Sequence, residues 1–397
     1  MSPCKVSRRA FVGAAVSSSL ARPGSAGDRI SIGIIGVGGR GQFHVRDLAK
    51  LPDQAAVTAI CDVYRPTREQ AAAMAAKTWG RAPRQTADYR ELLGWREVDA
   101  VIISTPDFSH SRILQHAVEA GKDVYCEKPM GTVFSEAKSA YLAVKKSRQV
   151  VQIGTQRRSE GPYVAAAKLV RSGALGQITR IDVSVNFQEP RWRRDYSKVV
   201  EADIAWKQFL MHLPGRPFEA RRLREWQLFS DYTNGIAGLW MSHFSDVVHW
   251  YMDELYPSGA VANGGVFFWK DGRETSDVFH ALLDYPKGFL FSFAMSLTNS
   301  AGNHNLWLGT RGTLDMDALT ISGAGSKQPD RIVKEERIQP EQVSSHMQNF
   351  LDCVRSRGTP RADIQAGFSH AVAGVMASEA LRTGRRIGFD RERLELI

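Results

Sequence analysis

Cysteine is scarce in this chain, with four among 397 residues. Cys4, Cys61, Cys126 and Cys353 stand far apart, so no two of them form the short spacing of a zinc or redox motif. The same distribution argues against a disulfide framework. We expect Cys61 and Cys126, which lie at the ends of apolar runs, to be buried as small hydrophobic residues.

Long apolar runs are lacking as well, and no stretch is long enough to cross a membrane as a helix. The formal net charge is +10, but residues 1–26 carry four basic side chains and no acid, which leaves +6 on the remainder. Those basic residues are scattered, and no nucleic-acid-binding motif accompanies them. We therefore expect no membrane span and no nucleic-acid partner. A mildly basic surface either has no specific meaning or attracts anionic substrates.

The first residues form a targeting segment rather than part of the fold. Ser7-Arg8-Arg9-Ala10-Phe11-Val12 is a twin-arginine pattern, an apolar stretch runs on to Leu20, and Ser25-Ala26-Gly27 suits cleavage. The pattern predicts a twin-arginine signal peptide over residues 1–27 and a periplasmic or otherwise exported protein. Because that route carries proteins already folded, a nucleotide cofactor would be loaded before export, which favours a tightly held one.

The most informative pattern lies between Ile30 and Asp62. An apolar run leads into Gly36-Val37-Gly38-Gly39-Arg40-Gly41, a helical stretch follows, and a second apolar run ends at Asp62. This order of strand, glycine turn, helix, strand and acid is typical of a dinucleotide-binding site, whose phosphates lie at the helix N-terminus. The predicted cofactor contacts here are Gly36, Gly38, Gly39, Arg40, Gly41 and Asp62.

Asp62 also bears on which dinucleotide binds. Its carboxylate can hold the ribose hydroxyls of NAD(H), and its charge repels the 2′-phosphate of NADP(H). Arg40 and Arg65 lie close enough in the sequence to weaken that preference. We expect NAD(H) as the preferred cofactor, with NADP(H) as the alternative.

The chain divides into two parts of different texture. Short apolar runs alternate with helical patterns over residues 28–154, which predicts a doubly wound parallel sheet, a Rossmann domain. Residues 155–397 contain longer strands separated by turns, together with helical patterns near the C-terminus, which predicts an α+β domain with a large, mostly antiparallel sheet. We expect this second domain to bind substrate and support oligomerisation, and its C-terminal helices to pack back on the first domain. Its expected strands are 177–187, 260–270, 278–284, 289–297 and 305–314.

Two motifs follow strands of the first domain, at the sheet edge where ligands bind in folds of this kind. One runs from Ser104 to His110 and would reach over the cofactor. The other, Cys126-Glu127-Lys128-Pro129-Met130, would direct Lys128 toward the nicotinamide. The cofactor contacts predicted from these motifs are Thr105, Pro106, His110, Glu127 and Lys128.

Together, the glycine turn, the Thr-Pro…His loop and Glu127-Lys128-Pro129 resemble the glucose-fructose oxidoreductase / inositol dehydrogenase family. The resemblance covers nearly the whole chain after the signal, since the long second sheet also fits. It implies that Lys128 contacts the substrate hydroxyl and the nicotinamide ribose. It also implies a homodimer or homotetramer, formed through the open face of the second sheet.

The family's second signature, Asp-x-Gly-x-His-x-x-Asp, corresponds here to residues 239–246. His243 and Asp246 match it, whereas Leu239 and Met241 replace the first Asp and the Gly. In the family's sugar dehydrogenases that first Asp supports proton abstraction, so its loss changes the acid–base network. His243 is our candidate general base because an imidazole titrates near neutrality. Without its Asp partner it should titrate near its free pKa of about 6.5.

Three residues are candidates for substrate binding: Arg157, Trp192 and Asp246. Arg157 follows a turn near the expected cleft, where a guanidinium can hold hydroxyls or carboxylates. Trp192 belongs to a segment rich in arginine and tryptophan, residues 188–226, whose aromatic faces could stack on a sugar ring. A subunit contact or a solvated loop is the competing interpretation of that segment.

Two alternatives at the acid–base site stay open. Should His243 not be the proton acceptor, Tyr232 and His212 are the next candidates. His243, Asp246 and His249 could ligate a metal, but their spacing drifts around a helix, so we expect no metal.

These patterns predict an exported NAD(P)-dependent oxidoreductase acting on a sugar, polyol or sugar derivative, with Lys128 and His243 at the hydride-transfer site. A glycosidase that uses tightly bound NAD for transient oxidation and elimination is the first alternative, because some exported relatives work in that way and the Asp is missing. A non-catalytic protein that holds the nucleotide is the second. The sequence names no particular sugar.

Overall fold

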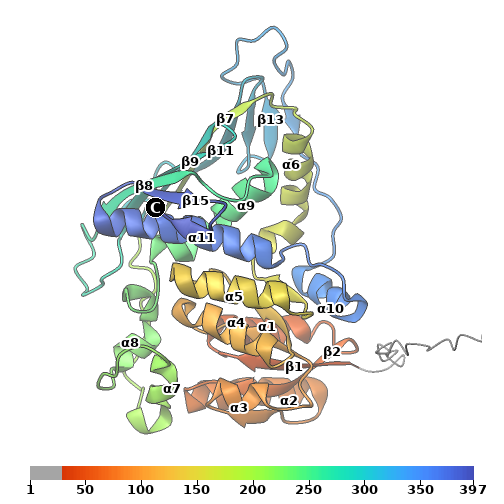
Figure 1. Ribbon diagram of the computed structural model, residues 1–397, viewed down its shortest axis with the longest axis vertical. Coiled ribbons are helices and arrows are strands. Elements are labelled where there is room, and N and C mark those ends of the chain that lie inside the picture. The colour runs from red at the N-terminus through yellow and green to blue at the C-terminus, as the bar shows by residue number, and fades with distance from the viewer. Residues whose placement is uncertain (1–28) are drawn as a thin grey trace, which may run out of the picture.

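The computed structural model describes residues 29–397 as two domains, one above the other in Figure 1. The predicted signal peptide, residues 1–27, lies outside the described residues. Over residues 29–397, no helix has both the length and the apolar character that a bilayer crossing requires.

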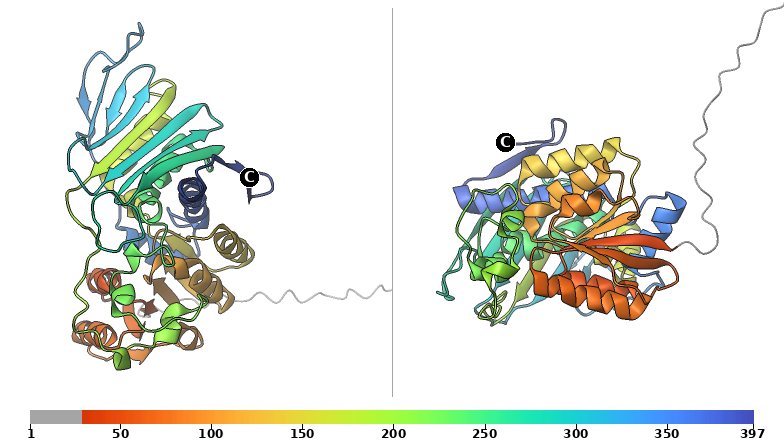
Figure 2. Two further views of the ribbon diagram at one scale, coloured as in Figure 1. Left: turned by 90° about the vertical axis from the view of Figure 1, so that its left-hand side faces the viewer. Right: turned by 90° about the horizontal axis from the view of Figure 1, so that it is seen from below.

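The first domain is a six-stranded parallel sheet in the order β3-β2-β1-β4-β5-β6. Figure 2 shows it from below with helices on both faces. Its central strand β4, Ala-Val-Ile-Ile, is apolar and buried along its whole length, as expected for a strand covered on both sides. The strands are β1 (Ile30–Ile35), β2 (Ala55–Cys61), β3 (Arg84–Thr86), β4 (Ala100–Ile103), β5 (Asp123–Cys126) and β6 (Val151–Ile153). The helices are α1 (Gly39–Leu48), α2 (Arg65–Trp79), α3 (Tyr89–Leu93), α4 (His110–Glu119) and α5 (Phe134–Lys146).

The second domain is built on a ten-stranded sheet in the order β14-β13-β12-β11-β7-β10-β9-β8-β15-β16. All neighbours pair antiparallel except β7 and β10, which run parallel. The predicted fold class is therefore confirmed. The strands are β7 (Ile178–Asn186), β8 (Gly259–Gly265), β9 (Val278–Tyr285), β10 (Phe289–Ser296), β11 (His304–Gly309), β12 (Thr313–Asp315), β13 (Thr320–Ser322), β14 (Glu336–Arg337), β15 (Ile387–Asp390) and β16 (Glu395–Leu396).

Helices cover one face of this second sheet and leave the other open (Figure 2, left). Those on or near the covered face are α6 (Gly161–Arg171), α9 (Ser242–Met252) and α11 (Ile364–Thr383). Two short helices, α7 (Trp206–Leu210) and α8 (Ala220–Arg224), lie instead beside the first domain, as Figure 1 shows. The remaining helix of this part of the chain, α10 (His346–Ser356), packs its apolar side against a core that includes β1 and β2.

Two of the expected long strands are shorter than predicted. The strand expected over 260–270 ends at Gly265, because the buried carboxylate of Asp277 accepts hydrogen bonds from the backbone N–H groups of Phe267, Phe268 and Trp269. That cap turns the chain away from the sheet. The strand expected over 305–314 is a hairpin, β11 and β12, with its turn at residues 310–312.

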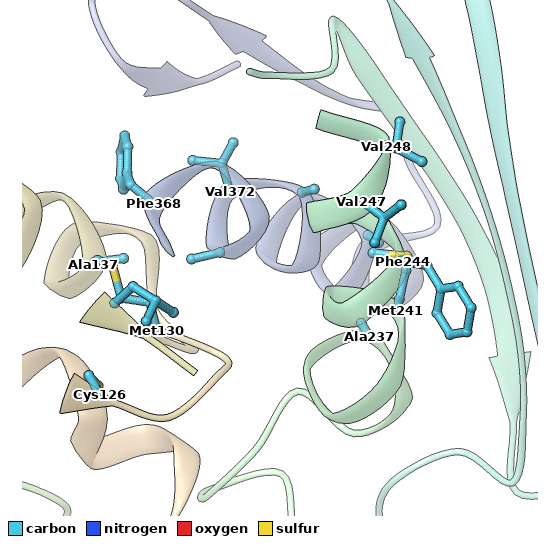
Figure 3. Close-up of a cluster of buried hydrophobic side chains, with 14 of the residues drawn as sticks. Cys126, Met130, Ala137, Ala237, Met241, Phe244, Val247, Val248, Phe368 and Val372 are labelled. Carbon is cyan, nitrogen blue, oxygen red and sulfur yellow. The ribbon is translucent and has the colours of Figure 1, made fainter. Parts of the chain in front are cut away.

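A single apolar core runs through the junction of the two domains (Figure 3). Met130, just after Lys128, and Ala137 of α5 meet Phe368 and Val372 of α11 there. Phe244 and Val247 of α9 complete the same cluster from the second domain, as Figure 3 shows. Because the segments before and after Lys128 and His243 are packed in one core, the two domains hold these residues in a defined relative position.

Candidate functional site

The glycine turn forms the floor of a cleft of about 650 Å³ at the carboxyl ends of the first-domain strands. A Cβ at Gly36 would lie 2.7 Å from the Thr105 backbone nitrogen, and one at Gly41 would lie 2.1 Å from the Gly36 carbonyl oxygen. Only glycine fits at either place. A Cβ at Gly38 or Gly39 would meet nothing within 4 Å, so the open space lies directly over these two residues. No side chain caps the N-terminus of α1, which leaves its free N–H groups to an anion. These features fit the pyrophosphate of a dinucleotide.

Asp62 lines the same cleft, at the end of β2. Its carboxylate accepts hydrogen bonds from the backbone N–H groups of Val37 (2.7 Å) and Tyr64 (2.9 Å). Burial raises its pKa, while these two bonds and the charges of Arg68 and Arg224 oppose the rise. The carboxylate is thereby held at the position where a ribose diol would lie. Thr105 and Pro106, the other predicted contacts in this region, also line the cleft.

The arginine-rich segment, residues 188–226, closes the cleft from the side of the second domain. Arg194, Phe209, Arg224 and Trp226 line the cleft opposite the glycine turn. The segment is fastened beside the end of β2 by a backbone bridge between Tyr64 and Ile204 and by an ion pair between Arg65 and Asp203. The central part of the segment, predicted to reach over the substrate, therefore lies over the cofactor cleft.

Trp192 does not offer a face to a substrate. Its side chain is only 9% exposed and belongs to the main core. Its backbone has φ +69°, in the left-handed region that residues other than glycine rarely adopt. The prediction that Trp192 stacks on a sugar is therefore at odds with the structure, because an indole used for packing cannot also contact a ligand.

Arg40 and Glu127, both predicted to touch the cofactor, contact each other, and Arg40 also lines the cleft. Arg40 Nε donates to Glu127 Oε1 at 2.6 Å, and His44 Nε2 lies 2.8 Å from the same oxygen. Although burial raises the pKa of Glu127, the hydrogen bonds and charges of His44 and Arg40 outweigh it and lower the pKa to about 2. The ion pair joins the glycine turn to the segment that contains Lys128.

His110 lies behind the cleft and does not line it. Its Nδ1 is 2.7 Å from the Pro129 carbonyl oxygen and its Nε2 is 2.8 Å from the Thr105 carbonyl oxygen. Carbonyl oxygens only accept hydrogen bonds, so a ring nitrogen is the donor in each of these contacts. Asp107, also buried, lies nearby. His110 thus ties the Thr105 loop to the Lys128 segment, and a direct cofactor contact, as predicted, does not fit this geometry.

Lys128 lies at the end of β5 and reaches across to the second domain. Its Nζ donates a hydrogen bond to the backbone carbonyl oxygen of Leu239 at 2.7 Å. Leu239 belongs to a π-helical turn, Ala237–Met241, which leads directly into α9. Such turns are frequent at functional sites. Burial lowers the pKa of Lys128, and the charges of Asp107 and Glu127 oppose that shift.

His243 stands in the first turn of α9, beside Lys128. Burial lowers its pKa well below the ordinary value, and the positive charges of Lys128 and Arg157 lower it further. The expectation that it titrates near 6.5 is therefore wrong, because a ring between two cations in a half-buried site resists protonation. The imidazole is neutral over the whole physiological range and can act as a hydrogen-bond acceptor.

Arg157 lies beside His243, whereas the carboxylate of Asp246 is paired with Arg158. The Arg157 guanidinium lies 4.0 Å over the Phe244 ring and donates a long hydrogen bond of 3.4 Å to the His243 carbonyl oxygen. Asp246 is 1% exposed and accepts hydrogen bonds from Arg158 Nε at 3.0 Å on both carboxylate oxygens. The prediction that Asp246 binds substrate does not fit this structure, because Arg158 occupies its carboxylate.

The other candidates from the sequence were a metal site that includes His249 and two alternative proton acceptors, Tyr232 and His212. Within residues 29–397, no three side chains of His, Cys, Asp or Glu gather as metal ligands. His249 Nε2 is 2.9 Å from the Tyr285 hydroxyl, and both side chains are buried. His212 pairs with Glu136 at 3.2 Å, and the fully buried Tyr232 packs against Phe108.

Sequence reasoning missed His44 and Arg158, whereas it placed the cleft residues Arg194, Arg224 and Trp226 in the 188–226 segment as candidates for contact with substrate. His44 follows Gly41 by three residues, so it falls on the same face of α1 and could have been noted from helical spacing. Arg158 carries no such signal, because only the packing of α9 within the second domain brings Asp246 to it.

Comparison with known proteins gives the same division of the chain. Residues 30–155 match the family model described as "Oxidoreductase family, NAD-binding Rossmann fold", and residues 167–389 match "Oxidoreductase family, C-terminal alpha/beta domain". Both models describe the Gfo/Idh/MocA group. The first domain is thus an NAD-binding Rossmann domain.

Similar curated proteins include two inositol dehydrogenases. The inositol 2-dehydrogenase of Salmonella typhimurium is 33% identical over 153 residues, which is 37% of this chain and 43% of that protein. The scyllo-inositol 2-dehydrogenase (NAD(+)) of Bacillus subtilis is 24% identical over 381 residues, 92% of this chain and 98% of that protein. The match to the Salmonella enzyme thus spans less than half of its length. Among solved structures, an NAD-binding protein from Listeria innocua has the same fold, with a TM-score of 0.68, 20% identity and coverage of 91% of this chain and 97% of that one.

Proposed function

Since this chain belongs to the Gfo/Idh/MocA oxidoreductase family, we propose that it is an NAD-dependent oxidoreductase acting on a sugar, polyol or sugar derivative. The observation that carries the proposal is the hydrogen bond from Lys128 Nζ to the Leu239 carbonyl at the edge of the nucleotide domain. It joins the two domains beside His243 and Arg157. In this proposal residues 28–154 bind the cofactor, and residues 155–397 bind the substrate.

The chemistry divides between the cofactor and the chain. Bound NAD supplies the hydride acceptor. Lys128, with its lowered pKa, can orient the substrate hydroxyl and take up its proton as the carbon–hydrogen bond is oxidised. The neutral imidazole of His243 can accept a hydrogen bond from the same or a neighbouring hydroxyl.

The residues near Asp62 support NAD(H) over NADP(H). Arg40 and Arg65 are the two arginines whose place in the sequence suggested a contact with a 2′-phosphate. Each pairs with a carboxylate, Arg40 with Glu127 and Arg65 with Asp203, and the Asp62 carboxylate lines the cleft. Mass spectrometry of the nucleotide released by denaturing the purified protein tests this: we expect NAD(H), and a predominance of NADP(H) would contradict it.

Activity is tested by following nicotinamide absorbance while the purified holoprotein is offered a panel of sugars, polyols and sugar derivatives. Net reduction of NAD by at least one of them is expected. If a sugar glycoside instead releases its leaving group while the bound cofactor shows no net change, the second candidate function applies.

That second candidate is an NAD-dependent glycosidase, in which transient oxidation allows elimination. One observation favours it: the arginine-rich segment closes the cofactor cleft and is fastened near Asp62. A cofactor retained under this segment would suit a reaction that returns NAD to its starting state. Hydrolysis of a nitrophenyl glycoside by holoprotein in the absence of added NAD distinguishes the two.

We also propose that the protein is exported by the twin-arginine route and held in the periplasm or beyond. The support is the Ser7-Arg8-Arg9-Ala10-Phe11 pattern. Replacing Arg8 and Arg9 by lysine should retain the protein in the cytoplasm on cell fractionation. Equal export of both forms would contradict the proposal.

Finally, we propose a homodimer or homotetramer formed through the open face of the second sheet. Val261 and its cross-strand partner Leu282 are 42% and 39% exposed there. Phe267 and Phe268, in the loop after β8, are 64% and 62% exposed. Light scattering should find an oligomer for the natural protein and a smaller species for a Val261→Asp, Leu282→Asp double variant. A monomeric natural protein would contradict this proposal.

A further inference from the structure

Arg157 is a cation beside the proposed reaction site with no carboxylate bound to it. Within residues 29–397, no Asp or Glu oxygen lies within ion-pair distance of its guanidinium, although 28 such pairs, some involving histidine, occur elsewhere. Its one hydrogen bond is the long contact to the His243 carbonyl. We infer that the natural substrate is a sugar acid whose carboxylate binds Arg157. The inference rests on the proposed function and narrows its substrate class.

Three acids near the site are engaged by other groups. Glu127 is bound to Arg40 and His44. Asp246 is bound to Arg158. Asp107 accepts a hydrogen bond from the Thr233 hydroxyl at 2.7 Å and faces His110. A fourth acid, Asp317, feels the charge of Arg157 but lies beyond ion-pair distance, so no carboxylate is bound to the guanidinium.

The residue at position 239 also leaves a positive charge at the site without a bound anion. The residue there is Leu239, so Lys128 is bound to a backbone carbonyl oxygen and not to a carboxylate. The site therefore holds two cations, Lys128 and Arg157, with no directly bound anion. Bound NAD in its oxidised form adds a further positive charge on the nicotinamide. An anionic substrate would offset this excess, whereas a neutral polyol would not.

The surroundings of Arg157 suit a carboxylate in particular. Its guanidinium is stacked 4.0 Å from the centre of the Phe244 ring and 5.1 Å from that of Tyr163. Rings of this kind hold the guanidinium plane and leave its N–H edge for ligands. A guanidinium edge matches the two oxygens of a carboxylate in a bidentate pair. Arg191, another arginine near the site, stacks on Trp240 but already pairs with Glu189 at 2.8 Å.

The test compares matched ligands that differ only in charge. Glucuronate and galacturonate are compared with glucose, galactose and the neutral amides of the two acids. Binding to holoprotein loaded with NADH is measured by calorimetry, and oxidation is measured separately with NAD. At least one acid should bind about 30-fold or more tightly than its neutral amide, the scale of a charge-assisted pair.

Two variants assign that preference to Arg157. Arg157→Gln should abolish the difference between acid and amide, whereas Arg382→Gln, at an exposed arginine on α11 that pairs with Glu379, should leave it intact. Folding is checked by retention of the bound nucleotide. A preference that survives Arg157→Gln would overturn the assignment.

The outcomes separate this inference from the proposed function. Tight binding of an acid without any NAD reduction would sustain the inference and refute net oxidation. If the protein oxidises neutral sugars and binds the acids no more tightly than their amides, the proposed oxidoreductase function is sustained and the inference of a sugar-acid substrate is refuted. A stronger preference for a sugar phosphate or sulfate would also overturn it, because the claim is for a carboxylate. Failure of every acid to bind more tightly than its amide refutes it outright.

Discussion

Lys128 Nζ donates its hydrogen bond to the main-chain carbonyl of Leu239, at 2.7 Å. The partner is backbone because the side chain at this position is apolar and cannot accept a proton. A carbonyl oxygen neutralises no charge, so the ammonium is stabilised less than it would be by a carboxylate. This contact is one of several that join the two domains, and it places the lysine where burial lowers its pKa against the opposing charges of Asp107 and Glu127.

Replacing Lys128 by methionine should lower turnover by about 10² or more, the scale expected for a lost acid–base or electrostatic group. Nucleotide binding should survive, because the glycine turn and Asp62 line the cofactor cleft and Lys128 is not among the residues that line it. Steady-state kinetics and the amount of nucleotide that co-purifies are the measurements. Lys50→Met, at a side chain that is 71% exposed, is the matched control. Near-normal turnover of Lys128→Met would remove the lysine from the site.

Leu239→Asp should restore an anion beside Lys128 and raise the pKa of the lysine. If the neutral amine takes up the hydroxyl proton, the rise of kcat with pH should move upward by about one unit. Leu239→Asn is the control, since it adds polarity without charge. If Leu239→Asp and Leu239→Asn give the same pH profile, a charge at position 239 does not change the pKa of the lysine.

His243 should contribute no ionisation step to the rate between pH 5.5 and 8. Its pKa is lowered well below the ordinary value by burial and by the charges of Lys128 and Arg157, so the ring stays neutral as pH rises through this window. His243→Gln should therefore lower kcat by about 10-fold or more through the lost hydrogen bond and leave the shape of the profile unchanged. A step near pH 6.5 that vanishes in this variant would contradict the assignment.

Glu127 should make the fold sensitive to acid. Its pKa is about 2, below the ordinary 4.5, because the bonds to His44 and Arg40 stabilise the ionised carboxylate. A lowered pKa gives stability that is fully present above about pH 4.5 and is lost as pH falls toward 2. Glu127→Gln should lower the free energy of unfolding at pH 7 by about 2–3 kcal/mol and flatten its acid dependence.

Denaturant unfolding at several pH values measures this effect. Glu341→Gln is the control, because Glu341 pairs with Lys168 at the surface and such pairs contribute roughly 0–1 kcal/mol. Equal losses of stability in the two variants would rule out a special role for the buried carboxylate.

The Arg158–Asp246 pair should matter for stability more than for substrate binding. Asp246 is buried, so Arg158→Met would leave an unpaired carboxylate inside the protein and destabilise it by about 3–5 kcal/mol. Replacing both residues, as Arg158→Met with Asp246→Leu, should recover part of that loss. Thermal unfolding of the three variants is the measurement. If the double variant is as unstable as the sum of the two single variants, the ion pair is not the cause.

The sequence by itself determined the nucleotide domain and the fold class. The glycine turn, the apolar β1 and the acid after β2 are local in the chain, and their spacing follows from strand and helix geometry. The position of Lys128 at a strand end followed for the same reason. The second sheet was also foreseen, but the strand expected over 260–270 ends at Gly265. The reason lies outside that strand: the carboxylate of Asp277 accepts hydrogen bonds from the backbone N–H groups of residues 267–269.

Only the tertiary structure decided which polar side chains are free. Asp246 and Glu127 match motifs, yet Arg158 and Arg40 occupy them across separations of 88 and 87 residues. Trp192 looked exposed in a polar segment, but the segment folds back so that the indole is buried and its neighbours line the cofactor cleft. A motif specifies where its backbone lies. The partner that a long charged side chain meets depends on how segments far apart in the chain pack within each domain, and no local pattern encodes that.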